Sequence, residues 1–130
     1  MFKLSESSQA KLVTCDVRIQ ELVNKVSEEY NISVICGHRG QQEQDDAFAK
    51  GMSKLHFPQS KHNSFPSLAV DLAPFPIDWN DKQRFVHMAG FVQGVAASLG
   101  YKIRWGGDFN QDNNFKNDSF IDMPHFELVE

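Results

Sequence analysis

Residues 60–74 constrain the fold more than any other stretch, because apolar side chains alternate with small or polar ones along their second half. The apolar positions are Leu68, Val70 and Leu72, and the positions between and after them are Ala69, Asp71 and Ala73. A period of two predicts a β-strand with one apolar face, and it places Asp71 on the opposite face between two small side chains. The chain is therefore expected to contain a sheet that presents an accessible carboxylate.

His62 precedes this strand and is joined to it by the turn sequence Asn-Ser-Phe-Pro-Ser. A turn of this length can bring the imidazole back beside Asp71. One histidine and one aspartate are two of the three protein ligands that a catalytic zinc site typically has. The alternative for this pair, taken alone, is a surface histidine and an aspartate at the end of a strand.

Length and charge limit the classes of function that the chain can have. Its 130 residues suit a single domain, expected over residues 1–130, and its net charge is −4. Lys and Arg form no run, which argues against nucleic acid or an anionic membrane as the main partner. The start of the chain lacks the apolar segment of a signal peptide. Cys15 and Cys36 are expected to be free buried thiols. We therefore expect synthesis in the cytoplasm and no stable membrane association.

Two segments have the apolar spacing of long amphipathic helices, at residues 8–30 and 81–99. Apolar positions recur at intervals of three and four in both segments. In the first segment they are Leu12, Cys15, Ile19, Leu22 and Val26, and in the second Phe85, Met88, Val92, Val95 and Leu99. Each segment is predicted to form one continuous helix, the second closed by Gly100.

Shorter patterns indicate three further strands, at residues 32–36, 101–105 and 121–129, and an exposed helix at residues 41–50. Arg39 follows the first of these strands in a Gly-His-Arg-Gly turn, where binding side chains are often presented. The alternative for Arg39 is a solvated cation. Together, the patterns predict an α+β fold in which a small antiparallel sheet packs against two long amphipathic helices.

The segment from Asp108 to Ser119 is acidic and rich in amides. Oxygen-bearing side chains at alternate positions, beginning with Asp108, Asn110 and Asp112, match the start of an EF-hand calcium loop. The glycine and the bidentate glutamate of that loop are replaced by Asn113 and Ser119. A surface loop is therefore favoured over a calcium site, and weak calcium binding is the alternative.

The terminal strand supplies a candidate for a third metal ligand. His125 and Glu127 alternate with the apolar Phe126 and Leu128, so the histidine projects from the polar face. A zinc hydrolase needs three ligands and a separate carboxylate that accepts a proton from water. His62, Asp71 and His125 can form the ligand set, and Asp122, three residues before His125, can be the base.

These motifs together resemble the LAS metallopeptidases, which include D-Ala-D-Ala carboxypeptidases, D,D-dipeptidases and phage L-alanyl-D-glutamate endolysins. The resemblance lies in a Ser-x-His…Ala-x-Asp element and a late Asp-x-x-His element, formed by Ser60, His62, Ala69, Asp71, Asp122 and His125. The order of predicted elements also matches, which implies the fold shared by hedgehog and D-Ala-D-Ala peptidases. The segment between His62 and Asp71 is longer than usual in the family, and the base is Asp where other branches have Glu.

Two further segments, residues 77–81 and 105–109, look most like the phage endolysin branch. This resemblance implies a zinc peptidase, with one zinc per chain, that cuts the L-alanyl-D-glutamate bond of peptidoglycan stem peptides and lyses the host wall. It implies that Arg39 stabilises the oxyanion or anchors the substrate carbonyl, and that Ser60 and Trp105 contact substrate. The enzyme is expected to be a monomer that is made in the host cytoplasm and acts on the wall after release.

Two alternatives remain from the sequence. A D-alanyl-D-alanine carboxypeptidase or dipeptidase would use the same zinc site on a different bond. A non-catalytic metal-binding module is the other, as the hedgehog relative of this fold illustrates. Asp122 beside His125 argues against the second alternative, because a structural zinc site needs no free carboxylate.

Overall fold

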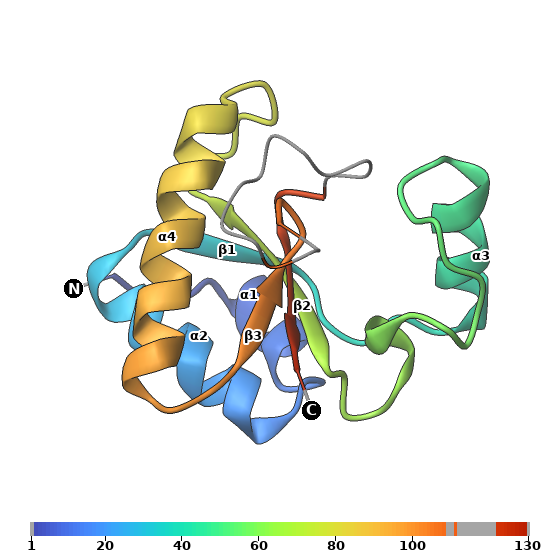
Figure 1. Cartoon of the computed structure of the whole chain (residues 1–130), viewed down its shortest axis with the longest axis horizontal. Helices are drawn as coiled ribbons and strands as arrows, with labels where there is room; N and C mark the ends of the chain where they lie inside the picture. Colours follow the sequence, from blue (N-terminus) through green and yellow to red (C-terminus); the bar gives the residue numbers. More distant parts are fainter. Residues whose placement is uncertain (1, 109–110, 112–121, 130) are drawn as a thin grey trace.

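The computed structural model describes residues 2–108, 111 and 122–129. Its centre is an antiparallel sheet with the strand order β1-β2-β4-β3 (Figure 1). The strands are β1 (Ile32–Cys36), β2 (Ala69–Pro74), β3 (Ile103–Trp105) and β4 (His125–Leu128). The last strand of the chain thus lies between β2 and β3 and is paired on both sides, which places His125 in the middle of the sheet.

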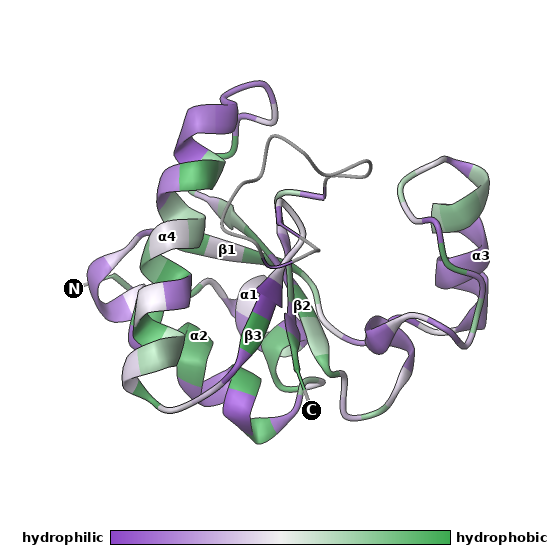
Figure 2. Ribbon diagram, in the orientation of Figure 1, coloured by the Kyte–Doolittle hydropathy of each residue, from purple (hydrophilic) through white to green (hydrophobic). Residues whose placement is uncertain are grey.

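Three helices gather around the sheet and the fourth is set apart from it (Figure 1). The three are α1 (Glu6–Leu12), α2 (Val17–Glu29) and α4 (Lys82–Ser98). α4 contacts α2, β2 and β3, and α1 contacts β1. The outlying helix is α3 (Gln41–Ala49), which is mainly hydrophilic in Figure 2. The predicted α+β class is confirmed.

The hydrophobic core forms where α2, α4 and the apolar face of the sheet meet. Val23, Val26, Leu72, Met88 and Val92 are fully buried there. Burial of each such side chain contributes about 1.5–3 kcal/mol relative to exposure, so these contacts hold the helices against the sheet. Among the described residues, none of the helices combines the length and apolar character that a bilayer span requires.

The first predicted helix is wrong in one respect, because the chain forms two helices and not one. The backbone between α1 and α2 bonds to Ser67: the Asp16 N–H donates to the Ser67 carbonyl (2.8 Å), and the Ser67 N–H donates to the Thr14 carbonyl (2.9 Å). Asp16 then caps α2 by accepting from the Arg18 N–H (2.8 Å). The spacing of apolar residues continues through the segment between α1 and α2 because Cys15, in that segment, is buried as well.

Two strands are shorter than predicted, since β3 covers residues 103–105 of the predicted 101–105 and β4 covers residues 125–128 of the predicted 121–129. The remaining elements follow their predictions closely. α4 begins and ends one residue inside the predicted range, and Gly100 has the positive φ (80°) of a helix C-terminal turn. β1 has the predicted bounds, and α3 ends one residue earlier than expected. Cys15 and Cys36 are both free thiols, the first buried and the second half-buried.

Candidate metal centre and active site

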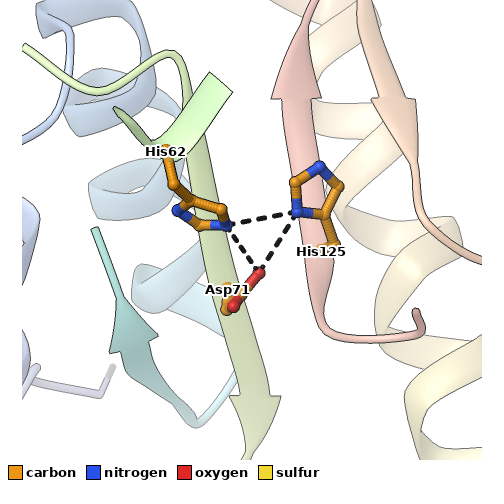
Figure 3. Close-up of side chains that lie close together, drawn as sticks. All are labelled: His62, Asp71 and His125. Atoms are coloured by element: carbon orange, nitrogen blue, oxygen red, sulfur yellow. Dashed lines mark hydrogen bonds and ion pairs between the residues drawn. The ribbon is translucent and has the colours of Figure 1, made fainter. Parts of the chain in front are cut away.

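His62, Asp71 and His125 meet in one buried group, as predicted (Figure 3). One ligand atom from each residue lies within 4.8 Å of the others. His62 Nε2 is 3.2 Å from Asp71 Oδ1 and 3.2 Å from His125 Nδ1, and His125 Nδ1 is 3.4 Å from Asp71 Oδ1. Two nitrogens and one oxygen converging in this way form the donor set of a metal site with three protein ligands.

The sheet and one short helix create this convergence. Antiparallel pairing places Asp71 of β2 directly opposite His125 of β4, so their side chains project from the same face. His62 lies in the 3₁₀-helix η1 (Lys61–Asn63). Ser60 caps η1 by accepting from the His62 N–H (3.2 Å), and Asn63 Oδ1 accepts from the Ser60 N–H (3.0 Å). This reciprocal cap fixes the backbone that carries His62.

Interactions within the group favour the ionised forms of His62, Asp71 and His125, although all three side chains are buried. Burial opposes protonation of His62, but the Asp71 carboxylate outweighs it and raises the pKa of His62 to about 10. The pKa of His125 is raised as well, since its hydrogen bonds to Asp71 and Glu127 outweigh its burial. Burial would raise the pKa of Asp71, yet the two histidines hold it well below its usual value. A proton on His62 therefore lies where these three residues could hold a divalent cation.

Arg39, which the resemblance assigns to the oxyanion or the substrate carbonyl, lies beside the metal-binding group. Its Nη2 lies 3.5 Å from Asp71 Oδ2, and its backbone N–H donates to the His62 carbonyl (2.7 Å). Its Nη1 donates to Gln44 Oε1 (2.9 Å), and Asn63 Nδ2 donates to the Arg39 carbonyl (3.0 Å). The guanidinium is thus held in place beside the metal-binding group.

The sequence pattern does not mark Gln44, which is fully buried and is the one buried residue of α3. Its Oε1 accepts from Arg39 and from Asn63 Nδ2 (3.2 Å), and its Nε2 donates to Ser53 Oγ (3.0 Å) and to the Leu55 carbonyl (2.6 Å). The sequence points to Gln44 only indirectly. Because α3 has no apolar stripe, a polar side chain has to connect this helix to the rest of the fold.

Asp122 lies in the turn that leads into β4. Its backbone N–H donates to the Gly106 carbonyl (2.7 Å), and a Cβ on Gly106 would lie 2.0 Å from the Asp122 carbonyl oxygen, so only glycine fits there. Burial, followed by the charge of Asp71, raises the pKa of Asp122 to about 6. A carboxyl with a pKa near neutrality is suited to proton transfer.

The resemblance implies that Trp105 and Ser60 contact substrate. In the structure, both side chains are buried and stabilise neighbouring backbone segments. Trp105 is buried, and its indole N–H donates to the Met123 carbonyl (2.7 Å), which holds the turn between Asp122 and His125. Ser60 is buried as the cap of η1.

The calcium expectation falls mostly outside the described residues. Asn110 and Asp112 are not among them. Asp108 is described and buried, and its backbone N–H donates to the Trp105 carbonyl (3.0 Å).

The site combines a buried two-histidine, one-carboxylate group that could hold a metal ion with a carboxyl of raised pKa and an anchored arginine, which are the residue types that metal-dependent hydrolases use. The family model of the phage L-alanyl-D-glutamate peptidases matches residues 1–129. The chain belongs to this family, and the resemblance predicted from its motifs is confirmed.

Two individual comparisons agree with this assignment. The chain is similar to the L-alanyl-D-glutamate peptidase of Escherichia phage T5, at 29% identity over 136 residues covering 98% of each chain. Its fold is similar to the crystal structure of the Serratia marcescens L-Ala D-Glu endopeptidase ChiX, with a TM-score of 0.74 at 20% identity, covering 98% of this chain and 90% of that one. The second likeness shows that the fold is shared.

Proposed function

We propose that this protein is a zinc peptidase that hydrolyses the L-alanyl-D-glutamate bond of peptidoglycan stem peptides. The observation that carries the proposal is the buried His62–Asp71–His125 group in a chain of the phage L-alanyl-D-glutamate peptidase family. The T5 relative is named for the same bond, and the motifs of the present chain resemble the same branch.

The donor set fits zinc. Two imidazole nitrogens and one carboxylate oxygen are ligands that zinc prefers, and three protein ligands leave a position for water or substrate. His62, Asp71 and His125 would hold the zinc, which would supply Lewis-acid activation of water and of the scissile carbonyl group. We expect one zinc per chain.

Asp122 and Arg39 have the chemistry that the remaining steps need. Asp122, with its pKa of about 6, is largely ionised at neutral pH and can accept a proton from the attacking water, then pass it to the leaving amine. Arg39 presents a fixed guanidinium beside the group, where it can stabilise negative charge that develops on the scissile carbonyl oxygen. Its bond to Gln44 means that this orientation exists before substrate binds.

The bond that is cut can be tested with purified peptidoglycan sacculi. Digestion should create new glutamate amino termini and alanine carboxyl termini, read by amino-terminal labelling and mass spectrometry of the fragments. The His125→Ala variant serves as the control for contaminating activity. Release of free D-alanine without new glutamate termini would replace the proposal with a D,D-carboxypeptidase. Zinc binding without any cleavage would favour a non-catalytic module.

Three further expectations from the sequence belong to this proposal. The enzyme acts as a monomer, which light scattering can test. It is made in the host cytoplasm and reaches the wall after release, which fractionation before and after lysis can test. Weak calcium binding by the segment from Asp108 onward would raise the lytic rate in a calcium titration at saturating zinc.

A further inference from the structure

His125 has two ring nitrogens with different surroundings. Nδ1 faces the metal-binding group, 3.4 Å from Asp71 Oδ1 and 3.2 Å from His62 Nε2. Nε2 faces the other way and lies 2.7 Å from Glu127 Oε1. A carboxylate can only accept a hydrogen bond, so Nε2 must carry the hydrogen in this pair. The lone pair of Nδ1 is then directed at the position of a metal ion.

His62 faces the metal-binding group with its other ring nitrogen, Nε2, and a backbone group orients its ring. Its Nδ1 lies 2.7 Å from the Gly37 carbonyl, which likewise can only accept, so Nε2 is the nitrogen left for the metal. The histidine of η1 is thus oriented by backbone, whereas the histidine of β4 is oriented by the side chain of Glu127. A substitution can remove a side chain but leaves a backbone carbonyl in place, so the orientation of His125 is the one that mutation can disturb.

Glu127 is itself held firmly. It is buried, and its Oε2 accepts from Arg104 Nη2 of β3 at 2.8 Å and lies 3.6 Å from Lys61 Nζ. Lys61 directly precedes His62 and also donates to the Leu128 carbonyl. One carboxylate therefore contacts His125 directly and also contacts the segment that carries His62.

Local geometry explains why Glu127 can do this. Residues two apart in a strand project from the same face, so His125 and Glu127 are neighbours on the polar face of β4. Pairing with β3 places Arg104 directly opposite Glu127. Arg104 and Lys61 hold the carboxylate in place beside His125.

We propose that Glu127 is a positioning residue that fixes the Nε2–H tautomer and the ring orientation of His125, so that the metal is bound through Nδ1. The inference rests on the proposed metal site and goes beyond it, because it assigns a role to a residue outside the ligand set. Carboxylates that accept from the distal nitrogen of a ligating histidine typically strengthen metal binding by about 10–100-fold.

The first test compares Glu127→Gln with wild type by zinc competition titration against a chromophoric chelator. The amide is nearly isosteric but loses the negative charge. The zinc dissociation constant should rise about 10–100-fold. Glu28→Gln is the matched control, because the Glu28 side chain on α2 is 46% exposed and forms an ion pair with Lys25 at 4.0 Å, on the same helix. Its dissociation constant should stay that of wild type.

The second test uses the wild type alone, so it stands even where Glu127→Gln does not fold. Long-range ¹H–¹⁵N correlation spectra of the zinc-loaded protein should show His125 with a protonated Nε2 and a metal-bound Nδ1. Metal bound through Nε2, or equal zinc affinities of Glu127→Gln and wild type, would overturn the inference and leave the proposed function intact. A wild type that binds no zinc would overturn both.

Discussion

The two halves of the active site are built in different ways. His62, Asp71 and His125, the metal half, lie on η1 and on two neighbouring strands, and their exposed fractions are 1%, 8% and 6%. Arg39 and Asp122, the proposed catalytic half, lie in turns that follow β1 and precede β4, and both are half-buried. Sheet register positions Asp71 and His125 and the capped helix η1 positions His62, whereas hydrogen bonds between connecting segments position the second half. Variants in the two halves should separate metal binding from turnover.

The largest effect is expected in the metal half. His125→Ala removes one of three ligands, so zinc content should fall from about one per chain to near zero, and activity should be lost with it. Metal analysis and a turbidity assay on sacculi measure both quantities. Full zinc content in this variant would place the metal elsewhere.

The Asp122→Asn variant should separate loss of activity from loss of zinc most clearly. The amide cannot accept the proton, so kcat should fall about 10²–10⁴-fold while zinc content and the melting temperature stay near those of wild type. Parallel loss of zinc and activity would instead make Asp122 a ligand and move it into the metal half.

Zinc affinity should depend steeply on pH. In the metal-free protein the pKa of His62 is about 10, so this imidazole favours the protonated form near neutrality, and the pKa of His125 is raised as well. Zinc needs neutral imidazoles, so binding at pH 7 should release one or two protons, and affinity should rise about 10–100-fold per pH unit. Calorimetry in buffers of different ionisation enthalpy counts these protons. Affinity independent of pH would show that the metal half is already deprotonated.

Gln44→Ala should give the smallest effect and should act mainly on the catalytic half, since Asn63 keeps its bonds to Ser60 and to the Arg39 carbonyl. Loss of the amide frees Arg39, so activity should fall about tenfold, equivalent to about 1.4 kcal/mol of transition-state stabilisation, with zinc retained. The buried partners left unsatisfied should lower the free energy of unfolding by about 1–3 kcal/mol. Gln42→Ala on the exposed face of α3 is the matched control. Equal activity in both variants would show that Arg39 keeps its orientation without α3.

Local periodicity explains which parts of the fold could be predicted. The alternation around Asp71 predicted β2, the spacing from Phe85 to Leu99 predicted α4, and the polar face of β4 predicted the projection of His125. In each case one face of the element is buried, and burial imposes the period on the sequence itself. The sequence also predicted that His62, Asp71 and His125 lie together, and this prediction came from their residue types and from motifs that resemble a family, with the period contributing only the faces of Asp71 and His125.

Other features depend on partners distant in the chain. The break between α1 and α2 comes from backbone bonds to Ser67, which no apolar spacing reports. From the sequence alone, Gln44 is expected on the surface of a polar helix. In the structure it bonds to Arg39 and to the Leu55 carbonyl. Trp105 offers the same lesson, since its indole holds a turn and packs in the core.

By itself, the sequence determined the elements, their buried faces and the residue types of the metal site, since these follow from side-chain periods within one segment. Only the tertiary structure decided that β4 lies between β2 and β3, which pairs Asp71 with His125. It likewise decided that Glu127 meets both Arg104 and Lys61. The physical reason is that hydrogen bonds between distant segments depend on strand order and loop path, and neither leaves a period in the chain.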